Sequence, residues 1–245
     1  MNRYPPTEPY NLWTGLYRGF ATPCRDLTAE DVSNDVLRRV RDAILRVPTR
    51  RRPHLLLKIT GWPRIGFLSR IFPEARFIHI LRDGRSVASS LLKVDWWWGW
   101  RGPSYWRWGP LSAEYQDQWE RSGRSFLALA GIQWKILMDA ADRAKAELPA
   151  DRLWELSYET LCQDPLAHLR SACEFAGLDW TGQAATAIGR TPVRSENEKW
   201  RREFTPTQQA TLEQVLASHL PRYGYSIADL GPGAAPPAAT PGAAR

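Results

Sequence analysis

The chain of 245 residues carries a formal net charge of +7 at pH 7, and 43% of its residues are hydrophobic. This length and composition allow a sizeable core and suit one large α/β domain. The cysteines form no C-x-x-C pair and the histidines lie far apart, so neither a disulfide framework nor a metal site is expected. The sequence starts without an apolar signal segment and has no run long enough to cross a bilayer, which predicts a cytoplasmic protein with no transmembrane segment.

The excess of positive charge favours an anionic partner such as a nucleotide, a nucleic acid, an acidic sugar or a membrane surface. Part of this excess is local, because arginines crowd one predicted helix and the loop after it: Arg38, Arg39, Arg41, Arg46, Arg50, Arg51 and Arg52. We interpret the cluster as a solvated face. The sequence contains no helix-turn-helix, zinc-finger or RNP-like pattern, so no nucleic-acid partner is expected.

The N-terminal part of the chain predicts an irregular segment followed by helix, strand and helix. Residues 1–25 are rich in Pro, Tyr and Gly. Thr28 and Asp31 predict a helix start, and the helix is continued by apolar residues at helical spacing: Val32, Val36, Val40, Ile44 and Val47. Residues 54–60 form an apolar run that predicts a strand, and residues 63–71 predict a short helix.

The centre of the sequence predicts a buried strand that passes directly into a helix. The apolar run over residues 77–81 ends at a glycine turn with Gly84, and helical spacing follows. Such a junction points free N–H groups and the positive helix end at one place. Arg82, Ser86 and Ser90 are spaced so that two hydroxyls can align behind a guanidinium, which indicates a phosphate site. The alternative is an ordinary junction whose polar residues only cap the helix.

Residues 95–110 are unusually aromatic, because they hold six of the 13 tryptophans. One interpretation is a loop that packs on its own aromatic rings. The other is an aromatic lid or platform for an acceptor such as a sugar, a ring or an acyl chain.

The C-terminal half predicts a long helix over residues 111–148, a strand over 152–158 and a helix over 164–177. A polar loop over residues 190–200 precedes a final helix over 205–220. The fold class is therefore α/β, with a P-loop-like parallel sheet flanked by helices. We expect a single domain over residues 1–228 and a disordered Ala/Pro/Gly tail over residues 229–245.

Three segments resemble the sulfotransferases that use 3′-phosphoadenylyl sulfate (PAPS), especially their bacterial branch. The segments are Phe72 to Arg85, Leu156 to Pro165 and Glu198 to Arg201, and they occur in the order that the family has. The similarity covers roughly residues 54–225. It implies that PAPS is the co-substrate, that no metal is needed, and that a sulfuryl group is transferred to a hydroxyl or an amine.

The resemblance also implies roles for individual residues. Arg82 and Ser90 would hold the 3′-phosphate of PAPS, in agreement with the spacing described above. Tyr158 would contact the adenine. Arg194 and Lys199 resemble residues of a late loop that closes over the same phosphate. Arginine suits a static phosphate because its planar fork binds two oxygens at once.

Lys58 matches the family lysine beside the transferring sulfuryl group, where an ammonium can follow the developing charge. Many members place a general-base histidine two residues later, but this chain has Thr60, whose hydroxyl cannot accept a proton at neutral pH. Asp95 and Glu8 are alternative bases. The acceptor is expected to be a small molecule, a carbohydrate or a glycolipid.

One family signature is missing from the sequence. Family members begin with a strand and a loop of the type Arg-Ser-Gly-Thr-Thr, which cradles the 5′-phosphosulfate, and the nearest string here is residues 14–19. We therefore expect a chain that lacks the first β-loop-α unit, so that its activity as written is uncertain. The alternative function is a truncated or degenerate relative that binds adenosine 3′,5′-bisphosphate without catalysis.

Overall fold

The computed structural model describes residues 10–21, 24–191 and 193–227, and these residues form two compact units. The first unit contains the described residues up to Ala75, with Arg107–Pro110 and Ile136–Leu148. The second contains Arg76–Trp106, Leu111–Lys135 and the described residues from Pro149 onward. Compactness alone does not decide whether units fold independently, so the single domain over residues 1–228 stays a prediction. The predicted tail, 229–245, lies outside the described residues.

Helices of the first unit enclose an aromatic and aliphatic core. The elements are α1 (Tyr10–Leu16), the 3-10 turns η1 (Arg18–Phe20) and η2 (Ala29–Asp31), α2 (Asn34–Leu45) and α3 (Ile65–Ile71). Trp13 and Phe20 are fully buried and stack with their ring centroids 5.0 Å apart. Helix α2 buries Val36, Val40 and Ile44, which confirms most of the predicted apolar stripe. All but one of the clustered arginines are exposed, as expected of a solvated face.

The predicted helix start at Thr28 is wrong. Thr28 and Asp31 do form a reciprocal capping box, but it begins the short turn η2. Helix α2 begins later, after Ser33, whose side chain accepts a hydrogen bond from the N–H of Val36 at 3.3 Å. The capping residues are therefore as predicted, but the element that they begin is a short turn and not a long helix.

The predicted strand over residues 54–60 is also wrong, because this segment has no regular secondary structure. Leu55 is 39% exposed and Leu56 is 88% exposed. A strand requires a partner for its N–H and C=O groups. None of the described residues forms a ladder with this segment.

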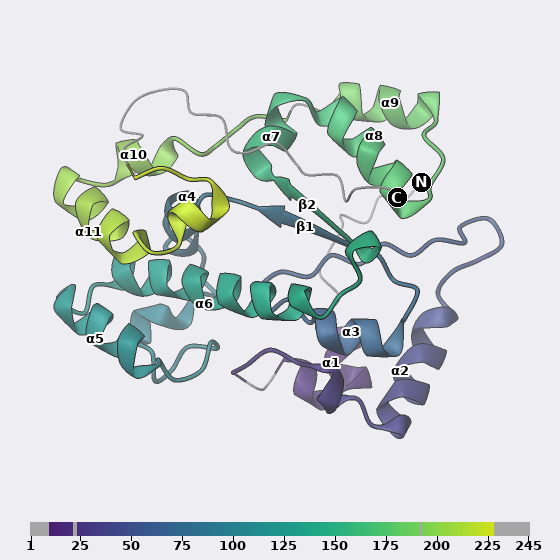
Figure 1. The fold of residues 1–245 in the computed structure, drawn as a ribbon, viewed down its shortest axis with the longest axis horizontal. Coiled ribbons are helices and arrows are strands. Elements are labelled where there is room, and N and C mark those ends of the chain that lie inside the picture. Colours follow the sequence, from purple (N-terminus) through teal and green to yellow (C-terminus); the bar gives the residue numbers. More distant parts are fainter. Residues whose placement is uncertain (1–9, 22–23, 192, 228–245) are drawn as a thin grey trace. The chain divides into compact units, whose positions relative to one another are not determined.

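The second unit contains a parallel pair of strands, β1 (Phe77–Leu81) and β2 (Leu153–Ser157), which confirms the α/β class and both of these predicted strands. The described residues contain no other strand. Phe77 pairs with Leu153 and Leu81 with Ser157, so both strands end at the same edge (Figure 1). The expected burial of β1 is incomplete, because Ile78 and Ile80 are 38% and 51% exposed.

The connection between the strands holds α4 (Gly84–Leu91), η3 (Trp98–Arg101), α5 (Ala113–Arg121), α6 (Phe126–Ala146) and η4 (Ala150–Arg152). The predicted single helix over residues 111–148 is thus two helices. Gly123 and Arg124 interrupt it with φ angles of 68° and 56°, in the left-handed region that ends a helix.

After β2 the chain forms α7 (Tyr158–Gln163), α8 (Pro165–Ala176), α9 (Gly182–Gly189), α10 (Lys199–Glu203), α11 (Pro206–Leu216) and η5 (Leu220–Tyr223). Helices α10 and α11 lie beside α4 (Figure 1). The predicted helix start at Pro165 and stop at Gly177 are confirmed, and the final helix ends a few residues before the expected position. None of the described helices combines the length and apolar character that crossing a bilayer requires.

Candidate functional site

The junction between β1 and α4 is built around a buried ion pair. Asp83 caps α4, since its side chain accepts a hydrogen bond from the N–H of Arg85 at 2.8 Å. The Arg85 guanidinium returns to the same carboxylate and also lies 3.2 Å from Glu213. Burial opposes the charge of Arg85, but the two carboxylates outweigh it and raise its pKa. The N–H of Arg85, expected to be free for an anion, is therefore already bound.

Gly84 is the first residue of α4. Close packing explains the need for glycine at this position better than a turn does. A Cβ at this position would lie 2.8 Å from the indole ring of Trp134. Its φ is not in the left-handed region, so the backbone does not require glycine. The expectation of a glycine turn is corrected accordingly: the glycine lets an aromatic ring approach the start of the helix.

Arg82 lies where β1 ends, and it is brought together with Tyr158 and Arg194. Its Nε donates to the side-chain oxygen of Asn197 at 3.0 Å. Its guanidinium carbon lies 4.4 Å from the centre of the Tyr158 ring, a cation–π contact. The Tyr158 hydroxyl in turn donates to the main-chain oxygen of Arg194 at 3.0 Å. Three residues singled out from distant parts of the sequence thus form one cluster.

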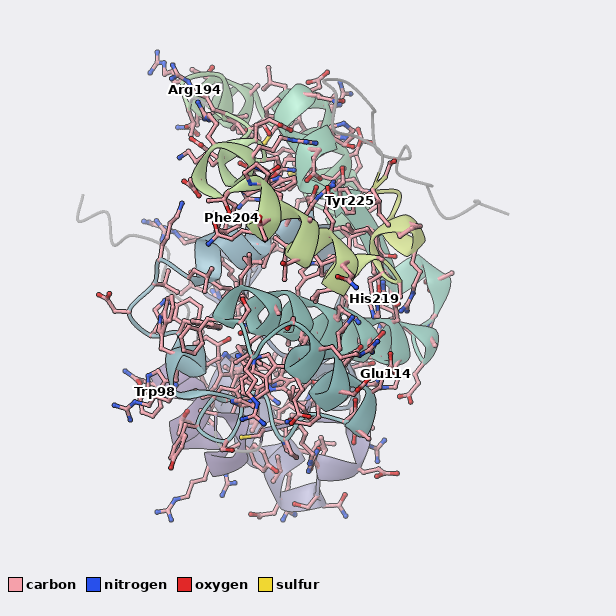
Figure 2. All side chains as sticks on the ribbon, turned by 90° about the vertical axis from the view of Figure 1, so that its left-hand side faces the viewer. Trp98, Glu114, Arg194, Phe204, His219 and Tyr225 are labelled. Atoms are coloured by element: carbon pink, nitrogen blue, oxygen red, sulfur yellow. The ribbon has the colours of Figure 1, made fainter. Side chains whose placement is uncertain are left out.

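A carboxylate, that of Glu159, lies beneath this cluster and accepts three hydrogen bonds. The donors are the N–H of Asp83 at 3.2 Å, the amide of Asn197, and the hydroxyl of Tyr225 at 3.0 Å. Burial, followed by the charge of Glu159, raises the pKa of Tyr225, so the phenol remains a donor. Figure 2 labels Arg194 and Tyr225, which come from the loop before α10 and the segment after η5.

The two serines of the predicted phosphate site have different surroundings. Ser86 is buried, and its hydroxyl donates to the main-chain oxygen of Asn197 at 2.8 Å. Ser90 is exposed one turn further along α4. Its neighbour Ser89 is buried instead and donates to Glu203 at 2.6 Å. The spacing therefore places one hydroxyl in the hydrogen-bonded cluster and leaves the other at the surface.

Lys199 is half exposed and pairs with Glu196 at 2.6 Å. The hydrogen bond from Lys199 lowers the pKa of Glu196. Lys58 belongs to the first unit, in the exposed segment that forms no strand. Thr60 follows in the same segment, and its main-chain oxygen accepts a hydrogen bond from the Tyr10 hydroxyl.

The aromatic loop has a buried anchor and exposed rings. Trp97 is buried, and its indole N–H donates to Gln133 at 2.6 Å. Four other rings of the loop are largely exposed: Trp96, Trp98, Trp100 and Tyr105. Figure 2 shows Trp98 at the edge of the viewed face. Trp97 and Trp100 contact each other edge to face with ring centroids 5.0 Å apart, so the loop packs partly on its own rings, and the acceptor platform stays a prediction.

Of the two alternative bases, Asp95 is exposed in the chain before η3, and Glu8 lies outside the described residues. Residues 14–19, the nearest match to the missing loop, belong to the end of α1, η1 and the residues between them. Within the described ranges, no group of three or more His, Cys, Asp and Glu side chains could hold a metal ion.

Asn197, Glu159 and Tyr225 were missed by sequence reasoning. Asn197 lies between Arg194 and Lys199, both of which had been singled out, and Glu159 directly follows Tyr158. Glu159 lies inside a matched segment and Asn197 directly precedes one, which was the available signal, whereas Tyr225 lies outside all three segments. The hydrogen bonds of these residues could not be read from the sequence, because they join residues far apart in the chain.

A family profile described as "Sulfotransferase family" matches residues 21–182, which is more than half of the chain. A search of curated proteins gave no match, and neither did a search of solved structures.

Proposed function

Because the chain belongs to the sulfotransferase family, we propose that it transfers a sulfuryl group from PAPS to a hydroxyl or an amine of an acceptor. The observation that carries this proposal is the cluster at the carboxyl end of β1. There Arg82, Tyr158 and Arg194 meet on three separate segments. In parallel α/β sheets, ligands bind beyond the carboxyl ends of the strands.

We assign the 3′-phosphate of the nucleotide to Arg82, with the helix serines Ser86 and Ser90 beside it. The terminal nitrogens of Arg82 make no hydrogen bond to any described residue, so their fork is available for two phosphate oxygens. Ser86 uses its hydrogen on Asn197 and can still accept one. Ser90 is exposed and offers its hydroxyl directly.

Tyr158, Arg194 and Lys199 would complete the nucleotide site. Arg82 covers one face of the Tyr158 ring, and we assign the adenine to the other face. Lys199 is paired with Glu196, so a bound phosphate would compete with that carboxylate for the ammonium. Arg194 is exposed in the same loop, so its guanidinium is accessible to a ligand.

In the proposed reaction the acceptor oxygen or nitrogen attacks the sulfur of PAPS, while the bond from sulfur to the bridging 5′-phosphate oxygen breaks. The proton of the acceptor goes to a base, and the products are the sulfated acceptor and adenosine 3′,5′-bisphosphate. Lys58 would stabilise the charge that builds up on the bridging oxygen. Asp95 and Glu8 remain the candidate bases.

For the acceptor we propose a small molecule, a carbohydrate or a glycolipid. The exposed rings of Trp96, Trp98 and Trp100 support this, because flat apolar rings on an anchored loop can stack on sugar rings or acyl groups. The anchor is Trp97, held by Gln133. Such a loop loses little conformational entropy when it binds.

Incubation of the purified chain with PAPS and a panel of phenols, alcohols, amines, oligosaccharides and glycolipids tests the proposal. We expect release of adenosine 3′,5′-bisphosphate that depends on one class of acceptor and falls about 100-fold in Arg82→Ala, which loses two charge-assisted hydrogen bonds. Arg76→Ala, at the other end of β1, is the matched control and should keep the wild-type rate. If none of the acceptors in the panel causes release of adenosine 3′,5′-bisphosphate, the proposal is contradicted.

A further inference from the structure

Asn197 is the point at which the late loop is attached to the carboxyl end of β1. It is 8% exposed, although its neighbours Glu196 and Glu198 are exposed. Its main-chain oxygen accepts from Ser86 at 2.8 Å, and its side-chain oxygen accepts from Arg82 at 3.0 Å. A buried polar side chain inside an otherwise exposed loop costs free energy unless its partners compensate.

The amide of Asn197 is oriented by its two neighbours. Its oxygen faces the Nε of Arg82, which can only donate, and its nitrogen faces the carboxylate of Glu159, which accepts. The reverse orientation would leave both contacts unsatisfied. Glu159 is itself held by Tyr225 and by the main chain of Asp83. Glu159 and its own partners therefore fix the orientation of the Asn197 side chain.

This arrangement also fixes the direction of Arg82. With Nε bound to Asn197 and the guanidinium carbon 4.4 Å from the centre of the Tyr158 ring, the guanidinium group is held at two points. Arginine otherwise loses considerable rotamer entropy when it binds a phosphate. A side chain that is already held binds its ligand at a smaller entropic cost.

We propose that Asn197 is a positioning residue: it orients Arg82 for the 3′-phosphate of the nucleotide and at the same time holds the late loop, residues 193–198, on β1 and α4. The orienting role rests on the proposed function. The loop attachment does not, so the two parts can be tested separately.

The ligand test measures the affinities of Asn197→Ala for adenosine 3′,5′-bisphosphate and for adenosine 5′-monophosphate by titration calorimetry. We expect about tenfold weaker binding of the bisphosphate, as for one lost hydrogen bond to a charged group, and an unchanged affinity for the monophosphate. Ser195→Ala, an exposed position in the same loop, is the matched control. Equal losses for both ligands would overturn the orienting role, because they would reflect a general disturbance of the site.

A double-mutant cycle separates orientation from packing. If Asn197 acts through Arg82, then Asn197→Ala in an Arg82→Ala background should add less than about a twofold loss of bisphosphate affinity. A full additional tenfold loss would contradict action through Arg82. Should Asn197→Ala fail to fold, Asn197→Ser replaces it. Its shorter side chain cannot reach both Arg82 and Glu159 but keeps a polar group at the buried position, and the same loss restricted to the bisphosphate is expected.

The loop attachment is tested without any ligand. Hydrogen exchange of the amides of residues 193–198 should be at least about tenfold faster in Asn197→Ala than in wild type or Ser195→Ala, since two attachments of the loop weaken. Unchanged exchange would overturn the attachment. If wild type binds neither nucleotide, the proposed function fails and the orienting role fails with it. If wild type binds the bisphosphate but Asn197→Ala binds it equally well, only the orienting role fails.

Discussion

Residues 54–60 and residues 77–81 are both short apolar runs, yet only the second forms a strand. Burial does not separate them, because Ile80 of β1 is 51% exposed and Leu55 of the other segment is 39% exposed. Pairing does. All five residues of β1 have partners in β2, whereas residues 54–60 form no ladder with described residues. An apolar run therefore specifies a strand only when a partner of matching register is present.

The two segments also differ at their carboxyl ends. Beyond β1, the chain enters the buried pair of Asp83 and Arg85 and the cluster around Arg82. Beyond residue 60, a bend leads to α3. Long-range hydrogen bonds are present at both ends, because the main-chain oxygen of Thr60 accepts from the Tyr10 hydroxyl, whereas only the end of β1 leads directly into a helix. The following predictions test whether these bonds and the strand pairing make the difference.

The largest effect on stability is expected from Arg85→Ala. The substitution leaves the carboxylates of Asp83 and Glu213 without their buried cation, which costs about 3–5 kcal/mol. Urea unfolding measures the loss. Arg121→Ala is the control, because Arg121 forms an exposed pair with Asp117 and should cost less than about 0.5 kcal/mol. Similar losses in the two variants would show that the Asp83–Arg85 pair does not hold the end of β1.

A pair of leucines compares the paired sheet, represented by β2, with the unpaired segment, residues 54–60. Leu156 of β2 is 3% exposed, so Leu156→Ala should destabilise the protein by about 2–5 kcal/mol. Leu56 is 88% exposed, so Leu56→Ala should change the free energy of unfolding by less than about 0.5 kcal/mol. If Leu56→Ala is as costly as Leu156→Ala, residues 54–60 are packed in solution and the contrast is lost.

The smallest effect concerns acid stability. Hydrogen bonds from Lys93 and then Ser89 lower the pKa of Glu203, which attaches α10 to α4. A carboxyl whose pKa is lower in the folded state stabilises the protein above its unfolded pKa of about 4.3, and this contribution disappears as the pH falls through the folded pKa.

Because the Lys93–Glu203 pair is partly exposed, its contribution should stay below about 1 kcal/mol. Urea midpoints between pH 6 and pH 3 should fall more steeply for wild type than for Glu203→Gln. Parallel curves for the two proteins would contradict the assignment.

Local chemistry made part of the fold predictable. The start of α8 follows from Asp164 and Pro165, and its end from Gly177, because caps and left-handed glycines act within a few residues. The break before α6 carried the same signal, because Gly123 is also in the left-handed region, but this signal was missed. The absence of a strand near Lys58 could not be predicted, because strand pairing depends on distant residues.

The candidate site likewise contains residues that the sequence identified and residues that it did not. Spacing and resemblance singled out Arg82, Tyr158 and Arg194, and the structure brings these three together. Asn197 lies 115 residues from Arg82 in the sequence, and nothing local indicates that the two side chains meet. Its neighbours also have polar side chains, and only the fold distinguishes the buried amide from them.

The central claim is that Arg82 holds the 3′-phosphate of the nucleotide, and Arg76 provides a matched control. Both arginines flank β1 and both lie over an aromatic ring, Phe175 for Arg76 and Tyr158 for Arg82. The most direct measurement is titration calorimetry of adenosine 3′,5′-bisphosphate with wild type, Arg82→Ala and Arg76→Ala. The account predicts about 100-fold weaker binding for Arg82→Ala alone. Wild-type affinity in Arg82→Ala, or equal losses in both variants, would contradict it.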